Sequence, residues 1–175
     1  MTFETDRLIL RPWRESDAES LYEYAKNPLV GPIAGWPVHT SVENSLEIIR
    51  TVLASDGNYA ITLKNEDKAI GSIGLMFAPK ANTFISAGEA EIGYWIGQPY
   101  WGLGYVPEAA RELMKYAFNQ LNVTKLWCGY FDGNEKSKRV SEKCGFSFYR
   151  TEKNKPWTAM NTTKDHHLTC ITKQQ

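Results

Sequence analysis

Cysteine is scarce in this sequence, and the few cysteines form no recognisable pattern. The 175 residues include only Cys128, Cys144 and Cys170, an odd number with wide spacing. No CxxC motif occurs, and no cysteine and histidine have the spacing of zinc ligands. We therefore expect no metal site. The three cysteines are interpreted as reduced thiols that pack as small apolar residues, as in a reducing compartment.

An excess of charge is missing as well. The 20 Lys and Arg residues balance the 20 Asp and Glu residues, so the formal net charge is +0. Proteins that bind nucleic acid usually carry a basic excess. The composition therefore indicates no nucleic-acid partner, and it leaves open only a local basic patch.

Long apolar runs are also absent. No stretch approaches the roughly 18 apolar residues of a membrane-spanning helix. The opening MTFETDRLILRPW has acidic residues before a short apolar stretch, which is unlike a secretory signal. We expect a cytoplasmic protein with no membrane partner. The length suits one domain over residues 1–175.

The hydrophobic pattern alternates between strand and helix periods. Residues 89–96 are the most informative strand, because their second half is apolar on both faces, as in the centre of a sheet. Other strands are predicted at residues 7–13, 58–64, 70–78, 125–131, 146–152 and 167–172. The sum is a mixed α/β fold.

Two helices are predicted in the first third of the chain. Ser16, with Glu19 three residues later, has the pattern of a capping box and predicts a helix over 17–27. The segment 29–40 is rich in Gly and Pro and predicts a loop. Ser41 is expected to cap the next helix, whose inward side carries Leu46, Ile49 and Leu53.

Two more helices are predicted in the second half. Pro107 suits the first turn of a helix. The apolar positions of that helix follow a helical period: Ala110, Leu113, Met114, Ala117, Phe118 and Leu121. A shorter helix over 134–144 is expected to end at Gly145.

The residues between the central strand and the Pro107 helix have the pattern of an anion site. In Trp101-Gly102-Leu103-Gly104-Tyr105-Val106, two glycines stand beside a helix start, where free N–H groups face outward. The alternative is a tight turn that binds nothing. A dinucleotide fingerprint would need a third glycine where Pro107 stands, and a P-loop would need GK[ST].

Three segments in this order give the loop a context. The sequences AEIGYWI, YWGLGYVPEA and NEKSKRVSEKCGF resemble the GNAT acetyltransferase superfamily, in particular its RimJ/RimL-like branch of ribosomal-protein N-terminal acetyltransferases. The opening TDRLILRPWRESDAESLYEYAKNP is similar to that branch too. The resemblance covers most of the chain.

The resemblance implies a fold and a cosubstrate. The fold would be a GNAT fold: a mostly antiparallel, twisted sheet of about six to seven strands, splayed after the fourth, with about four helices. The cosubstrate would be acetyl-CoA, with its pyrophosphate on the loop and its pantetheine arm along the splayed strand. The residues implied in cofactor binding are Trp95, Ile96, Trp101, Gly102, Leu103, Gly104, Tyr105, Val106, Asn134 and Ser137.

The resemblance also implies catalytic roles. Glu91 is the expected general base, and Ser137 the candidate general acid, because Ser141 stands where many relatives have a tyrosine. Tyr149 is a second candidate for the acid. The alternatives are an ordinary charged residue at the strand start, solvated or paired, for Glu91, and a plain helix residue for Ser137.

Two sets of side chains near the expected site stay open. The basic run Lys136, Lys138 and Arg139 is either a solvated face or a contact to the 3′-phosphate. The aromatic residues Trp36, Tyr94 and Phe131 either line the acceptor cleft or pack in the core.

The expected function is transfer of an acetyl group to a primary amine, with a protein or peptide N-terminus as the favoured acceptor. A small amine (polyamine, amino acid or antibiotic) is one alternative, and a silent acyl-CoA-binding module is another. We expect a monomer or a homodimer.

Overall fold

One sheet contains all eight strands of the part of the chain that the structure describes, residues 1–173 of the computed structural model. The strands are β1 (Phe3–Glu4), β2 (Leu8–Arg11), β3 (Asn58–Leu63), β4 (Glu66–Met76), β5 (Glu89–Ile96), β6 (Lys125–Phe131), β7 (Ser147–Trp157) and β8 (Thr162–Thr172). Their order is β1-β2-β3-β4-β5-β6-β8-β7. Every neighbouring pair is antiparallel except β5 and β6, which are parallel. The mixed α/β fold predicted from the sequence is confirmed.

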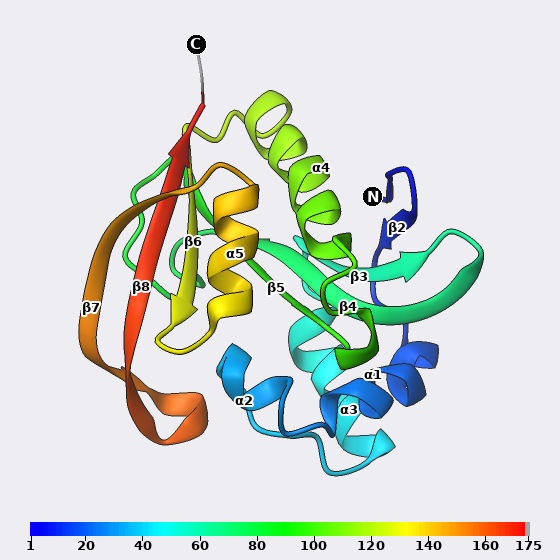
Figure 1. Ribbon diagram of the computed structural model, residues 1–175. Coiled ribbons are helices and arrows are strands. Elements are labelled where there is room, and N and C mark those ends of the chain that lie inside the picture. The colour runs from blue at the N-terminus through cyan, green and yellow to red at the C-terminus, as the bar shows by residue number, and fades with distance from the viewer. Residues whose placement is uncertain (174–175) are drawn as a thin grey trace.

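Helices cover both faces of the sheet (Figure 1). They are α1 (Ala18–Ala25), α2 (Gly31–Ala34), α3 (Val42–Ile48), α4 (Tyr105–Asn119) and α5 (Glu135–Lys143). On one face α4 and α5 pack over the main core, which includes Leu113 of α4 and Leu126 of β6. On the other face α1 and the segment after α3 pack Leu21 and Ile49 against the sheet. The two faces therefore have separate cores.

The sheet parts in its middle. Strands β5 and β6 pair only where Glu89–Glu91 lie beside Lys125–Trp127. Beyond Glu91 the two strands separate, and the rest of β5 has no strand beside it on that side. A splay is expected after the fourth predicted strand, residues 89–96. In the structure this strand is β5, because the short β1 precedes the first predicted strand. The parting decides where a ligand can enter.

Several local predictions are confirmed. Strands β5 and β6 have the predicted bounds. The Ser41 Oγ accepts a hydrogen bond from the Asn44 N–H (3.1 Å) and caps α3. Gly145 has a φ of 85° after α5, the left-handed conformation of a helix C-cap.

Three local predictions are wrong. Ser16 is not a helix cap: the turn begins one residue earlier, and the Asp17 carboxylate, which also binds Arg11, accepts the Arg14 N–H (2.9 Å). The segment 29–40 is not all loop, because α2 forms within it. Leu121 does not face the core: α4 ends at Asn119 and leaves Leu121 exposed.

The cysteines are unpaired, as expected. Cys128 and Cys144 are buried, and Cys170 is half-buried. Among residues 1–173, no helix is both long enough and apolar enough to span a membrane.

Candidate active site

A cavity of about 380 Å³ lies where β5 and β6 separate. Its lining includes Tyr94 and Ser137, which lie on the α4 and α5 side of the sheet. It also includes Phe131 and His166, which lie on the side of α2. The cavity lining therefore includes residues from both faces of the sheet.

The glycine loop forms one end of the cavity. Gly102 and Gly104 have φ values of 79° and 81°, a conformation that favours glycine. A Cβ added at Gly102 would meet nothing within 4 Å. Gly104 is the N-cap of α4, so the first N–H groups and the positive end of this helix face the same space. The loop has the room and the donors for a phosphate group.

A brace from the N-terminus holds this loop. Arg7 donates through Nη1 to the Leu103 carbonyl oxygen (3.0 Å) and through Nε to the Glu108 carboxylate (2.7 Å). Thr5 Oγ1 donates to the same carboxylate (2.6 Å). The Arg7 guanidinium also lies 4.5 Å from the ring centre of Tyr105. The loop conformation thus depends on residues about a hundred positions earlier.

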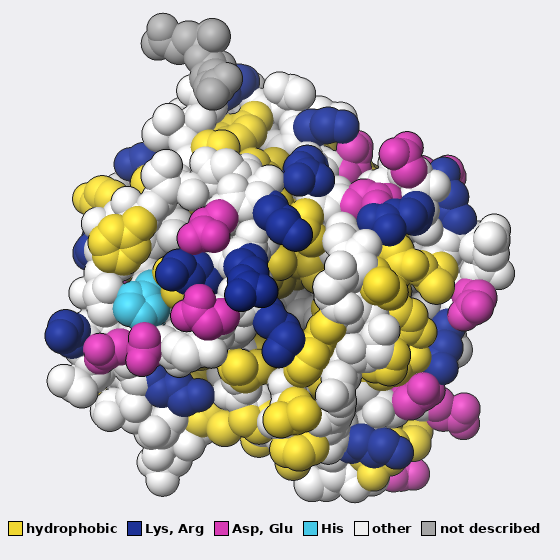
Figure 2. Space-filling model, viewed as in Figure 1, with side chains coloured by type: hydrophobic (Ala, Val, Ile, Leu, Met, Phe, Trp, Pro, Cys, Tyr) yellow, Lys and Arg dark blue, Asp and Glu magenta, His cyan; other side chains and the backbone are white. Residues whose placement is uncertain are grey.

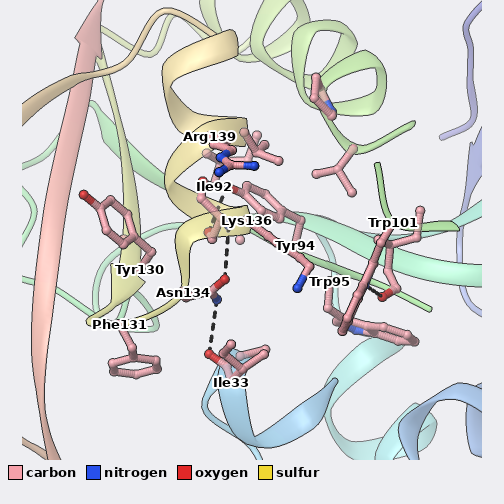
Figure 3. Close-up of a pocket in the computed structure, with 18 of the residues that line it drawn as sticks. Ile33, Ile92, Tyr94, Trp95, Trp101, Tyr130, Phe131, Asn134, Lys136 and Arg139 are labelled. Atoms are coloured by element: carbon pink, nitrogen blue, oxygen red, sulfur yellow. Dashed lines mark hydrogen bonds between the residues drawn. The ribbon is translucent and has the colours of Figure 1, made fainter. Parts of the chain in front are cut away.

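Basic side chains from α5 line the cavity near the loop. These are Lys136, Arg139 and Lys143, and Figure 2 shows Lys and Arg side chains gathered over this helix. The Lys136 Nζ lies 4.2 Å from the ring centre of Trp101, across the mouth of the cavity (Figure 3). Lys138 is not part of the lining and lies 3.9 Å from Glu135. The structure thus divides the basic run into two residues that face the cavity and one that does not.

Tyr94 and Ser137 meet inside the cavity. The Tyr94 hydroxyl lies 3.1 Å from Ser137 Oγ and 3.5 Å from Cys128 Sγ. Burial raises the pKa of Tyr94 well above its ordinary value, so the hydroxyl keeps its proton. The Asn134 side chain accepts the Ser137 N–H (3.1 Å) and so caps α5. Asn134 and Ser137 both line the cavity, as the resemblance implied.

Glu91 lies at the point where the strands part, and it is 3% exposed. Its carboxylate accepts the Asn82 N–H (2.6 Å), the Asn82 side-chain amide (3.1 Å) and the Thr83 N–H (3.3 Å). Burial raises the pKa of Glu91, while these hydrogen bonds oppose that rise. The residue lines the cavity and also anchors the 77–88 loop, so its role as a base stays a prediction.

The remaining predicted cofactor residues surround the same space. Trp101 donates through Nε1 to the Ile96 carbonyl oxygen (3.0 Å). This carbonyl is one of the backbone groups expected to bind pantetheine, and it already has a hydrogen-bond partner within the protein. The Trp95 side chain stacks on Trp13, with ring centres 6.4 Å apart. The residues of this set that line the cavity are Trp95, Ile96, Trp101, Gly102, Gly104, Tyr105 and Val106; Leu103 does not.

Helix α2 lies at the opposite end of the cavity. Helix α2 is held across the parting by the Asn134 Nδ2, which donates to the Ile33 carbonyl oxygen (3.3 Å), and by Lys164 Nζ, which donates to that of Pro32 (3.1 Å). The rings of Phe131 and Trp157 pack edge to face there, with their centres 4.6 Å apart. Phe131 therefore lines the cavity, whereas Trp36 packs against Trp95 outside the lining.

Sequence reasoning missed His166, a buried residue of the cavity lining. It lies in the alternating pattern of the last strand and gave no signal of its own. Its position follows from pairing with Phe131 on β6, which only the fold brings about. Tyr149, the second candidate for the acid, lies on the exposed side of β7 against Trp127 and is not part of the lining.

The lining fits coenzyme A in its chemistry. The glycine loop, the start of α4 and the side chains of Lys136 and Arg139 suit phosphates. The free side of β5 offers backbone groups and the buried side chains of Ile92 and Ile96 to a long neutral arm.

Known proteins match this chain over most of its length. The family model for the acetyltransferase (GNAT) domain matches residues 7–147. An uncharacterized N-acetyltransferase, p20 of Bacillus licheniformis, is 32% identical over 130 residues, which are 71% of this chain and 70% of that protein.

Two solved structures share the fold. Mycobacterium smegmatis RimJ in complex with CoA-disulfide is 20% identical, with a TM-score of 0.77 over 98% of this chain and 86% of that one. The ribosomal-protein-S5-alanine acetyltransferase of Vibrio fischeri is 22% identical, with a TM-score of 0.71 over 98% and 96%. The family match, the relative and the cavity agree: the chain belongs to the GNAT family of acetyltransferases, enzymes that use acetyl-CoA.

Proposed function

We propose that this acetyltransferase transfers the acetyl group of acetyl-CoA to the α-amine of a peptide or protein N-terminus, by direct attack while both substrates are bound. The observation that carries the proposal is the cavity at the parting of the sheet, with phosphate-binding groups at one end and Glu91 and an aromatic wall at the other. The acetyltransferases for ribosomal proteins among the structural neighbours support this choice of acceptor.

On the acceptor side, the amine must be neutral before it attacks the thioester. An α-amine has a pKa of about 7.7 to 8.0, against about 10.4 for a lysine side chain, so it needs less help. Glu91 accepts the proton, directly or through a water molecule. Its position at the parting of β5 and β6 puts this carboxylate beside the unpaired part of β5. Backbone N–H groups of that part are suited to stabilise negative charge on the acetyl oxygen.

On the donor side, acetyl-CoA supplies an acetyl group bound to a thiol. The bond between the acetyl carbon and sulfur breaks as the amine bonds to that carbon. Ser137 Oγ donates a proton to the departing sulfur and takes one from solvent in the same step, while the Tyr94 hydroxyl, 3.1 Å away, orients the serine. A thiol pKa of about 8.5 makes the thiolate a tolerable leaving group, so this assistance is modest.

The test is an acceptor panel. Thiol release from acetyl-CoA is followed with short peptides that have free N-termini, with the same peptides blocked at the N-terminus, and with polyamines and amino acids. We expect turnover with free N-termini and none with the blocked set. Turnover confined to polyamines or amino acids contradicts the proposed acceptor, and binding without turnover contradicts the enzyme assignment.

A further inference from the structure

The His166 imidazole is a polar group of the cavity lining, and the proposed reaction gives it no task. It is 3% exposed and lies between the rings of Phe131 (5.2 Å) and Trp157 (5.9 Å). The ring crosses Gly129, where an added Cβ would overlap it. Glycine at this position therefore lets the imidazole lie against β6, two residues beyond Trp127, which pairs with Glu91.

The partners of the ring decide which nitrogen carries the proton. Nδ1 faces two groups, the Lys155 Nζ at 3.4 Å and Glu152 Oε2 at 3.5 Å. Lys155 is held in place by Glu152 and by the Asn82 carbonyl oxygen, both at 2.6 Å. Lys155 is the nearer of the two, and an ammonium group can only donate, so we assign Nδ1 as the acceptor and the ring proton to Nε2.

The charge state of the ring is fixed as well. Burial, and then the positive charge of Lys155, lower the pKa of His166 to about 4. The imidazole is therefore neutral at pH 7 and is a poor base for an amine. Its Nε2–H is a hydrogen-bond donor and not a proton acceptor.

This donor has no partner in residues 1–173. Every fully enclosed side-chain nitrogen or oxygen there has a hydrogen-bond partner. Nε2 has no such partner, so this atom is not fully enclosed, and His166 is part of the cavity lining. A donor that has no protein partner is free to bond a ligand oxygen in the cavity.

We infer that His166 determines acceptor specificity by donating its Nε2–H to a carbonyl oxygen next to the reacting amine. In a peptide or an amino acid amide, such an oxygen stands one carbon away from the α-amine. A polyamine or a plain alkylamine has no such oxygen. The inference rests on the proposed function and deepens it, since His166 and Glu91 line the same cavity.

The experiment compares two amines of similar shape, alaninamide and sec-butylamine, which differ in the carbonyl group. The ratio of their kcat/KM values is measured across pH and expressed per neutral amine. In the wild type we expect a ratio of at least about ten for alaninamide, the effect of one hydrogen bond. His166→Leu removes the donor and should lower this ratio about tenfold, mainly through KM. His166→Gln keeps an N–H near the Nε2 position and should restore most of it.

His167→Leu is the matched control. His167 is the next residue of β8, and its nitrogens bond Thr151 and Asp132 outside the cavity lining. The ratio should be unchanged in this variant. The melting temperature of each variant, with and without acetyl-CoA, shows that it folds and binds the donor. If His166→Leu does not fold, the ratio of the kcat/KM values for alaninamide and sec-butylamine in the wild type tests the inference.

The outcomes separate the two proposals. A wild-type ratio near one, or the same ratio in the wild type and His166→Leu, overturns the role of His166 while the acetyltransferase stands. Acetyl-CoA binding with no acetylation of any amine overturns the proposed function, and this inference with it.

Discussion

The Tyr94 hydroxyl lies 3.1 Å from Ser137 Oγ and so joins the middle of β5 to the first turn of α5 across the parting of the sheet. The same hydroxyl also donates toward the Ser137 carbonyl oxygen at 3.2 Å. Strand β5 and helix α5 are therefore held together beside the expected path of the donor, at the level where β5 no longer pairs with β6.

Removing either hydroxyl tests the proposed acid. Ser137→Ala should lower kcat by about tenfold, because a thiolate leaves tolerably without help. Tyr94→Phe should cost less, since the serine remains. In the double variant, Tyr94→Phe should add almost nothing, because the tyrosine acts through the serine. Steady-state kinetics with saturating acetyl-CoA give these values. An unchanged kcat in Ser137→Ala would mean that the sulfur leaves without an acid.

A side chain at the glycine loop should weaken donor binding. Gly104→Val places a β-branched residue at a φ of 81° and crowds the expected phosphate position. Calorimetric titration with acetyl-CoA should show a loss of affinity of at least about tenfold, on the scale of the backbone strain. Gly88→Val is the control, because Gly88 has a φ of 82° and is not part of the cavity lining. An equal loss in both variants would point to general destabilisation.

Glu91→Gln should reduce turnover most at neutral and acidic pH. Glutamine keeps the shape but cannot take the proton, and at high pH the amine is already neutral. The reduction should be about 10²- to 10⁴-fold where it is largest, and larger for a lysine-like amine than for an α-amine. Glu89→Gln, which changes a carboxylate on the same strand outside the lining, is the control. A wild-type to variant ratio near one at every pH would identify Glu91 as an anchor of the 77–88 loop only.

The buried histidine should make stability depend on pH. The pKa of His166 is about 4 in the folded protein, against 6.5 for an ordinary exposed histidine. Because the folded pKa is the lower one, its contribution is complete above pH 6.5 and is lost as the pH falls toward 4. The loss is on the order of 3 kcal/mol in the free energy of unfolding.

Urea titrations of the wild type and His166→Gln between about pH 7 and pH 4 measure this loss. The variant should lose less stability over that range. Lys155, Glu152 and His167 also act on this ring, so the comparison with the variant isolates the histidine. Parallel curves would show that folding does not lower the pKa of His166.

Local patterns predicted most of the frame of the site. The bounds of β5 and β6, the caps at Ser41 and Gly145, and the helix after the glycine loop depend on neighbouring residues, and the structure has them as expected. The Ser16 cap was wrong because Arg11, six residues before Asp17, holds the Asp17 carboxylate and sets where the turn begins.

The acceptor end could not be predicted from local patterns. His166 reaches the cavity through pairing of β8 with β6 and through the missing side chain of Gly129. Helix α2 is only four residues long and is held by Asn134 and Lys164, both more than a hundred positions away. Contacts at such sequence separations leave no periodic signal in the chain.

If the donor binds at the glycine loop as proposed, the hydrogen bonds from Arg7 to Leu103 and Glu108 link its binding to the docking of the turn between β1 and β2. Thermodynamic reciprocity requires that a ligand which favours the ordered loop also favours the docked segment around Thr5 and Arg7, by the same free energy. Loss of this segment, by proteolysis for example, would reduce affinity for the donor although none of its residues lines the cavity. In the proposed donor site, the turn between β1 and β2 would thus act through linkage and not through contact.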